Sequence, residues 1–252
     1  WIQQRFFSSF KNVDLSNSII IPHGIEKKNN MILKNKQKNI LFVGKLNHAK
    51  GYHIFADAAA KFKKINPDWN FIAIGNEARK NIFPDPNIVK EIGYKKNSEV
   101  LNYYTKSEIA IGNSVWDEPL GRIAIEASSR KCLPIISNKG GLAESKNIAL
   151  VLKNNNSNEL LKLLKKVTSN IKYRRNNQKA TFISLFFQIK NRYKSMVYEY
   201  TQNKSVFVAA KSLVLSSFFS QYRLQYTRNH IEFQRFATIR LFHLITYASH
   251  LS

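Results

Sequence analysis

The sequence predicts an α/β protein built on a parallel, doubly wound sheet, and three observations lead to that prediction. Short apolar runs and segments of helical spacing alternate between residues 39 and 152. The runs are apolar on consecutive positions, as strands buried on both faces are. Gly, Asn or Pro bounds them, which is typical of turns. Alternation of strands and helices indicates a parallel sheet flanked by helices.

Five strands and three intervening helices are expected. The strands are Ile40–Val43, Phe71–Ile74, Ile109–Ile111, Leu133–Ile136 and Ile148–Leu152. The helices are Tyr52–Lys64, Ser98–Lys106 and Gly121–Arg130. In the first helix, Ile54, Ala58 and Phe62 fall four apart and form one apolar face. The arrangement is Rossmann-like, and such sheets bind ligands outside the carboxyl ends of their strands.

Helices are also expected beyond the sheet, in residues 157–200. Their first part has an apolar stripe formed by Leu160, Leu161, Leu164 and Val167. Their second part, Ile183–Tyr200, is both apolar and basic. We therefore expect residues 37–200 to form one domain, with a helical C-terminal region.

The two ends of the sequence differ from this domain. Residues 1–36 form a polar leader around one short apolar run, Ile19–Pro22. Residues 201–252 are rich in aromatic and basic residues, with Glu232 as the one acidic residue. Two interpretations of this tail compete: a terminal helical pair, or a translation that has left its frame. Lys and Asn become less frequent there than in the rest of the chain, which slightly favours the second.

Composition limits the classes of function. Forty Lys and Arg against 16 Asp and Glu give a net charge of +24, which predicts attraction to polyanions such as nucleic acid, anionic lipid or phosphorylated ligands. The excess is spread along the chain and no nucleic-acid-binding motif accompanies it, so no specific nucleic-acid partner is expected. The lone cysteine, Cys132, excludes a disulfide framework and a cysteine-rich metal site. No signal peptide follows Trp1, and we expect the sequence to start inside a longer protein.

Two carboxylates flank a predicted helix start in the stretch WDEPLGRIAIEA, residues 116–127. Glu118 precedes the helix that Gly121 begins, and Glu126 lies about one and a half turns into it. Free N–H groups and the positive dipole end at Leu120 and Gly121 favour an anion. Carboxylates on both sides suit the hydroxyl-rich ends of a nucleotide sugar. The alternative is an ordinary surface loop, with Glu118 as a charge at the helix N-terminus.

A second stretch, ILFVGKLNHAKG at residues 40–51, ends a buried strand at Gly44 and leads to a helix near Gly51. Lys45 and Lys50 flank the turn. Two ammonium groups at the carboxyl end of a strand are well placed to neutralise a diphosphate. The alternative is two solvated lysines in a lysine-rich protein.

Together these stretches resemble the donor domain of GT-B glycosyltransferases of the retaining group 1, or family-four, type. The family has a Gly-Arg/Lys-Leu turn followed by Lys-Gly, and two glutamates separated by seven residues around a Pro-Phe-Gly. Further segments match it in order over roughly residues 18–200. They are Ile19–Ile25, Phe71–Gly75, Ile92–Tyr94, Ala127–Ser129, Leu133–Ser137 and Gly140–Glu144.

The resemblance implies a role for each matching residue. Lys45 and Lys50 would hold the diphosphate beside Gly44, and Glu118 would bind the donor sugar. These three are the candidate catalytic residues. The remaining candidate positions would bind substrate: backbone at Pro119, Leu120 and Gly121 for sugar and phosphate, Glu126 for the ribose, and Gly93 and Tyr94 for the base. The implied reaction is glycosyl transfer with retention, and no cofactor or metal is expected.

Two departures from the family bear on the site. Lys45 stands where Arg is commoner, and lysine lacks the bidentate fork of arginine. Leu120 replaces the usual Phe. The family's acceptor-binding domain would precede residue 18, so we expect this chain to be inactive alone and to need that domain for a cell-envelope glycan or lipid-linked acceptor.

Rival interpretations remain. Another GT-B enzyme, such as a nucleotide-sugar epimerase or a phosphorylase, would share the fold, although the setting of Glu118 and Glu126 argues against it. A non-catalytic basic polyanion-binding module would explain the charge alone. The expected location is cytoplasmic, with peripheral attachment to the anionic inner face of the cell membrane as a further expectation from the charge.

Overall fold

The computed structural model describes residues 36–79 and 81–202. The chain divides into two units, Trp1–Val197 and Tyr198–Ser252. The predicted leader 1–36, apart from Lys36, and the tail beyond Gln202 lie outside the described residues. Sequence predictions for those two segments therefore stay predictions.

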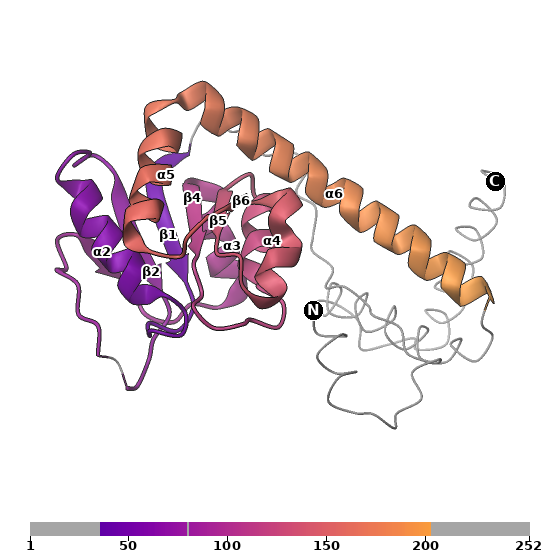
Figure 1. Ribbon diagram of the computed structural model, residues 1–252, viewed down its shortest axis with the longest axis horizontal. Helices are drawn as coiled ribbons and strands as arrows, with labels where there is room; N and C mark the ends of the chain where they lie inside the picture. Colours follow the sequence, from indigo (N-terminus) through magenta and orange to yellow (C-terminus); the bar gives the residue numbers. More distant parts are fainter. Residues whose placement is uncertain (1–35, 80, 203–252) are drawn as a thin grey trace, which may run out of the picture. The chain divides into compact units, whose positions relative to one another are not determined.

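A six-stranded, wholly parallel sheet forms the centre of the first unit (Figure 1). Its strands are β1 (Gln37–Val43), β2 (Asn70–Ile74), β3 (Val89–Glu91), β4 (Ser107–Gly112), β5 (Leu133–Ile136) and β6 (Leu150–Val151), in the order β3-β2-β1-β4-β5-β6. This is the Rossmann order, so the predicted doubly wound sheet is confirmed.

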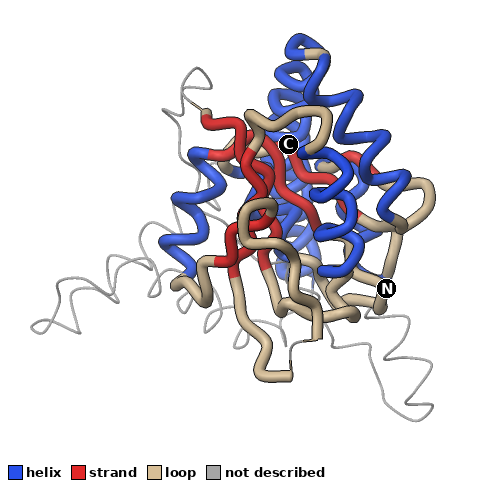
Figure 2. Tube along the Cα trace, turned by 90° about the vertical axis from the view of Figure 1, so that its left-hand side faces the viewer, coloured by secondary structure: helices blue, strands red, loops and turns tan. Residues whose placement is uncertain are grey.

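Helices cover both faces of the sheet, and Figure 2 shows the strands as a layer between them. The helices are α2 (Tyr52–Lys63), α3 (Asn97–Lys106), α4 (Arg122–Ser129), α5 (Ser157–Ser169) and α6 (Ile171–Gln202), with a 3₁₀ segment, η2 (Gly140–Ile148). Helix α2 lies against α5 on one side, and α3 lies against α4 on the other (Figure 1).

Alternate residues of the central strand supply the two main cores. In β1, Ile40 and Phe42 pack with α2 and α5, whereas Leu41 packs with α3 and α4. Both sets are at most 2% exposed. Each strand face therefore meets a helix layer, which explains why the strand sequences are apolar at consecutive positions.

The structure corrects the predicted elements in three places. It adds β3 and η2, which have no strong apolar periodicity of their own. The predicted strand Ile148–Leu152 is reduced to the two residues of β6, because Ile148 belongs to η2. Gly121 does not begin a helix but caps α4, with a left-handed φ of 57°.

Candidate functional site

A pocket of about 510 Å³ opens at the carboxyl ends of β1 and β4. These neighbouring strands are where the strand order reverses, since the chain continues from β1 toward β2 and β3 but from β4 toward β5 and β6. Loops leaving the two strands diverge there and leave a crevice, the usual ligand site of open α/β sheets.

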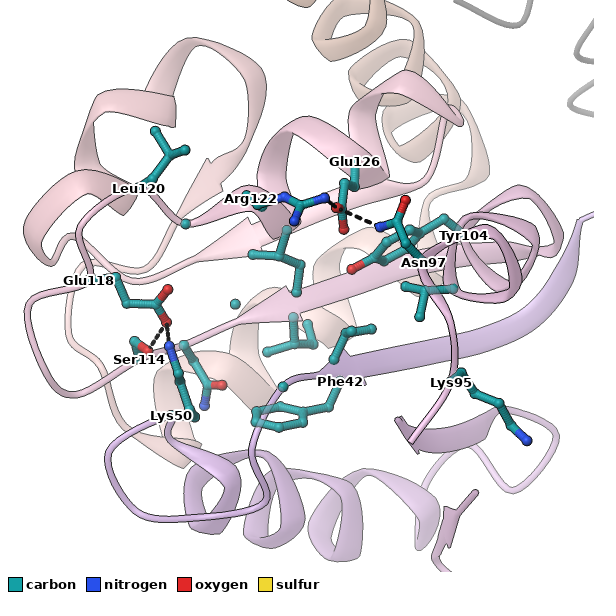
Figure 3. Close-up of a pocket in the computed structure, with 18 of the residues that line it drawn as sticks. Phe42, Lys50, Lys95, Asn97, Tyr104, Ser114, Glu118, Leu120, Arg122 and Glu126 are labelled. Atoms are coloured by element: carbon teal, nitrogen blue, oxygen red, sulfur yellow. Dashed lines mark hydrogen bonds and ion pairs between the residues drawn. The ribbon is translucent and has the colours of Figure 1, made fainter. Parts of the chain in front are cut away.

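Most of the predicted site residues line this pocket. They are Gly44, Lys50, Tyr94, Glu118, Pro119, Leu120, Gly121 and Glu126. These residues come from three loops and one helix that are far apart in the sequence. They meet around one cavity (Figure 3).

Two predicted residues, Lys45 and Gly93, are not among those that line the pocket. Lys45 is exposed, and its charge contributes to a lowered pKa of the Glu77 carboxylate, after the larger effects of hydrogen bonds from Asn47 and Arg79. Gly93 accepts a hydrogen bond from Gly75 N–H at 2.9 Å and so ties the end of β3 to that of β2.

The turn after β1 is tied to the loop after β4. The Asn113 side-chain amide donates a hydrogen bond to the Gly51 carbonyl oxygen at 2.9 Å. A Cβ at Gly51 would lie 2.1 Å from the Asn113 carbonyl oxygen, so only glycine allows this approach. Lys50, the preceding residue, is thereby placed at the pocket wall.

Glu118 is held at one oxygen by two neighbours. Lys50 Nζ lies 2.9 Å from Glu118 Oε1, and the Ser114 hydroxyl donates to the same oxygen. The Lys50 ammonium also lies 5.2 Å from the centroid of the Trp116 ring. Lys50 therefore places a positive charge in the pocket wall, where it is paired with the Glu118 carboxylate (Figure 3).

The Gly140-Gly141 pair supports the Glu118 loop from behind. Gly141 N–H donates to the Glu118 carbonyl. A Cβ at Gly141 would lie 2.1 Å from the Pro119 carbonyl oxygen, and a Cβ at Gly140 would lie 2.6 Å from Glu118 backbone atoms. The pair thus lets η2 pack against the loop without side chains between them.

Glu126 lies across the pocket from Glu118, and it too is held at one oxygen (Figure 3). Arg122 Nη2 lies 2.6 Å from Glu126 Oε1, and the Asn97 amide donates to Oε1 at 3.1 Å. Its side chain is 11% exposed. Helix α4 has no acidic residue in its first turn and no side-chain cap, and its positive end borders the pocket through Gly121 and Arg122.

A buried tyrosine, Tyr104, completes the wall near Glu126. Its hydroxyl has no hydrogen-bond partner among the described residues. Burial, with a smaller contribution from the charge of Glu126, raises the pKa of Tyr104 well above its usual value, so the group is a neutral phenol. Tyr94, which also lines the pocket, is 72% exposed.

Sequence analysis missed Asn97, Arg122 and Ser114. The spacing of Arg122 and Glu126, four apart on a helix, could have indicated their contact. Asn97 has no such signal, because it reaches Glu126 from a different helix. The described residues contain no cluster of three or more His, Cys, Asp or Glu suited to a metal ion, and none of their helices is long and apolar enough to cross a membrane.

Comparisons with known proteins agree with this architecture. The family model "Glycosyl transferases group 1" matches residues 25–182. Spore coat protein SA of Bacillus subtilis is 31% identical over 121 residues, which are 43% of this chain and 32% of that protein. An uncharacterized 42.6 kDa protein in the cps region of Klebsiella pneumoniae is 28% identical over 152 residues, 57% of this chain and 36% of that protein. The chain spans about a third of the length of these curated relatives.

Solved structures share the fold at low sequence identity. The C-terminal domain of a group 1 glycosyl transferase, LpcC of Francisella tularensis, matches with a TM-score of 0.54 and 22% identity, over 62% of this chain and 88% of that one. A glycosyltransferase of Rickettsia africae matches with a TM-score of 0.56 and 21% identity, over 67% of this chain and 48% of that one. The sheet is thus that of a GT-B C-terminal domain, and the chain belongs to the group 1 glycosyl transferases.

Proposed function

We propose that this chain provides the donor-binding domain of a retaining glycosyltransferase, which moves a sugar from a nucleotide-diphosphate sugar to a cell-envelope glycan or lipid-linked acceptor. One observation carries the proposal: Lys50, Glu118, Glu126 and the start of α4 meet around a single pocket. Structures of Anabaena HepE, which has a similar fold, were determined with UDP-glucose and with UDP and glucose.

The polar groups of the pocket suit the parts of such a donor. Glu118 and Glu126 each have one oxygen, Oε2, that takes no part in the ion pairs and hydrogen bonds described above. A carboxylate oxygen accepts hydrogen bonds from hydroxyls, which sugar and ribose both supply. The diphosphate between them would lie near Lys50 and the positive end of α4.

This arrangement favours departure of the diphosphate. When the bond from the anomeric carbon to the diphosphate breaks, its electron pair stays on the phosphate oxygen. Lys50 and the α4 N-terminus would stabilise that charge at a site already oriented for it. Lys45, placed outside the pocket lining, would have to move toward the phosphates to fulfil its predicted role.

The remaining parts of the proposal concern the whole protein. We propose that no metal or cofactor takes part, that the acceptor is bound by a further domain that closes over the donor, and that the enzyme works in the cytoplasm at the anionic inner membrane face. Alone, this chain would bind the donor weakly and transfer nothing.

Titration of the 252-residue chain with UDP, GDP and ADP, followed by calorimetry, tests the donor site. We expect saturable binding of one nucleotide, weakened about tenfold in Glu126→Gln because a charged hydrogen-bond acceptor is lost. Glu159→Gln, which removes the same charge from α5, is the matched control and should bind as the wild type does. A folded protein that binds none of the three would contradict the proposal.

Two other functions would give different results in further assays. If the full-length enzyme were a nucleotide-sugar epimerase or a phosphorylase, a product assay would find products other than those of sugar transfer. A polyanion-binding module, which the net charge of +24 favours, would bind any duplex with steep salt dependence and show no response to nucleotide sugars.

A further inference from the structure

Arg122 is a cation of the pocket lining whose side chain is largely exposed to solvent. It is the first residue of α4, lines the pocket, and has a side chain that is 57% exposed. Its described partner is Glu126, four residues on, with Nη2 at 2.6 Å from Oε1. Glu126 has a second donor to that oxygen, Asn97 at 3.1 Å, and keeps this support when Arg122 moves away.

Two electrostatic features count against the placement of Arg122 at the start of α4. A positive side chain at a helix N-terminus opposes the helix dipole, and the first turn of α4 contains no acidic residue to offset it. A basic residue that precedes its acidic partner by four positions is also the weaker order of such a pair. An anion at the N-terminus of α4 would offset the first effect, and it would offer Arg122 a partner in place of Glu126.

Arg122 differs from the other cations that line the pocket. Among the described lining residues these are Lys50 and Lys95. The side chain of Lys50 is 26% exposed and is paired with Glu118, and the Lys95 amine points away from the two carboxylates in Figure 3. Arg122 alone combines high exposure, a planar fork of donors and a place at the start of α4.

We propose that Arg122 binds the diphosphate of a nucleoside diphosphate, exchanging Glu126 for phosphate when the ligand enters. The inference rests on the proposed function and adds a residue to it. Guanidinium donors match phosphate oxygens in a bidentate geometry. The exchange leaves Glu126 Oε1 with Asn97 alone and opens that oxygen to a ribose hydroxyl. Phosphate and ribose recognition are thereby coupled through one ion pair.

The test compares a nucleoside diphosphate with its nucleoside. The probes are UDP with uridine, GDP with guanosine and ADP with adenosine, and binding to the 252-residue chain is measured by calorimetry and ligand-observed NMR. We expect Arg122→Gln to weaken diphosphate binding about tenfold, because charged hydrogen bonds to phosphate are lost. Nucleoside binding should stay equal or become stronger, since Glu126 is freed.

A matched control and a second variant complete the design. Arg79→Gln removes the same charge from an exposed position outside the pocket lining and should leave both affinities unchanged. Arg122→Lys keeps the charge without the fork, and we expect a diphosphate loss smaller than that of Arg122→Gln. This variant carries the test if Arg122→Gln does not fold.

The outcomes separate the inference from the function on which it rests. Equal losses for nucleoside and diphosphate would show that Arg122 only positions Glu126, and an unchanged diphosphate affinity would show that it does not reach the phosphates. Either result overturns the inference and leaves the proposed function standing. A folded wild-type chain that binds no nucleotide contradicts both.

Discussion

Strand β4 has a carboxylate cluster at each end, and the two clusters are bonded differently. At the amino end, Glu108 has a side chain that is 3% exposed. Both of its oxygens accept hydrogen bonds, from Arg175 at 2.8 and 3.0 Å and from Gln178 at 2.8 Å. At the carboxyl end, Glu118 and Glu126 each make the contacts described above through Oε1, and their side chains are 17% and 11% exposed.

This difference distinguishes a carboxylate whose two oxygens are both bonded from carboxylates that keep one oxygen outside the described contacts. Glu108 is buried and both of its oxygens are bonded, so neither is available to a ligand. Because Arg175 and Gln178 belong to α6, these bonds hold α6 against the sheet. A carboxylate that is oriented at one oxygen and open at the other is ready for a hydroxyl. Under the proposed function, the cluster at the amino end of β4 serves stability and the cluster at its carboxyl end serves recognition.

The largest effect should follow from breaking the amino-end cluster. Glu108→Gln leaves Arg174, which is 4% exposed, and Arg175 without their counter-charge. We expect the free energy of unfolding to fall by about 3–5 kcal/mol, measured by urea denaturation. Asp57→Asn, which breaks the exposed pair with Lys61, is the control and should change it by less than about 1 kcal/mol. A small loss of unfolding free energy in Glu108→Gln would show that the amino-end cluster is not more important for stability than the carboxyl-end cluster.

An intermediate effect is expected where the carboxyl-end loop is supported. In Gly141→Ala the new Cβ would meet the Pro119 carbonyl oxygen at 2.1 Å, and backbone must move. We expect a stability loss of about 1–3 kcal/mol, together with weaker nucleotide binding because the Glu118 loop shifts. Thermal unfolding and nucleotide titration measure the two effects. Unchanged binding would show that the loop adjusts without its support.

A third prediction concerns how stability depends on pH through the buried thiol of Cys132, the residue before β5. Burial raises the pKa of the Cys132 thiol to about 12, against an ordinary value of 9.0. The unfolded chain therefore loses this proton first, and stability falls as pH rises above 9. Relative to Cys132→Ala, the wild type should lose about 1 kcal/mol between pH 8 and pH 10. A difference that is constant over this range would indicate that solvent reaches the thiol.

The smallest expected change is in the stability of Glu118→Gln. Lys50 is 26% exposed and water can solvate it once the pair is broken. We expect the free energy of unfolding to change by less than about 1 kcal/mol, while nucleotide-sugar binding is lost or weakened. A loss as large as that of Glu108→Gln would mean that the carboxyl-end pair is structural after all.

Much of the fold could be predicted because its signals are local. The buried strands β1, β2, β4 and β5 are recognisable from consecutive apolar residues, and α2 from its apolar spacing. Strand β3 could not be found, since Val89 is its one buried residue and its pairing with β2 supplies what its sequence lacks. The conformation of Gly121 likewise depends on Leu142, which packs where a Cβ would be.

By itself, the sequence determined the layer architecture, the family and the motif residues Lys50, Glu118 and Glu126, because periodicity and motif spacing are written along the chain. Tertiary structure alone decided which side chains share the pocket. It placed Lys45 outside the lining, and it brought Asn97 to Glu126 from another helix and Ser114 to Glu118 within the loop. It also separated Glu108 from the other two glutamates, because burial and hydrogen-bond saturation follow from contacts between segments that are distant in sequence.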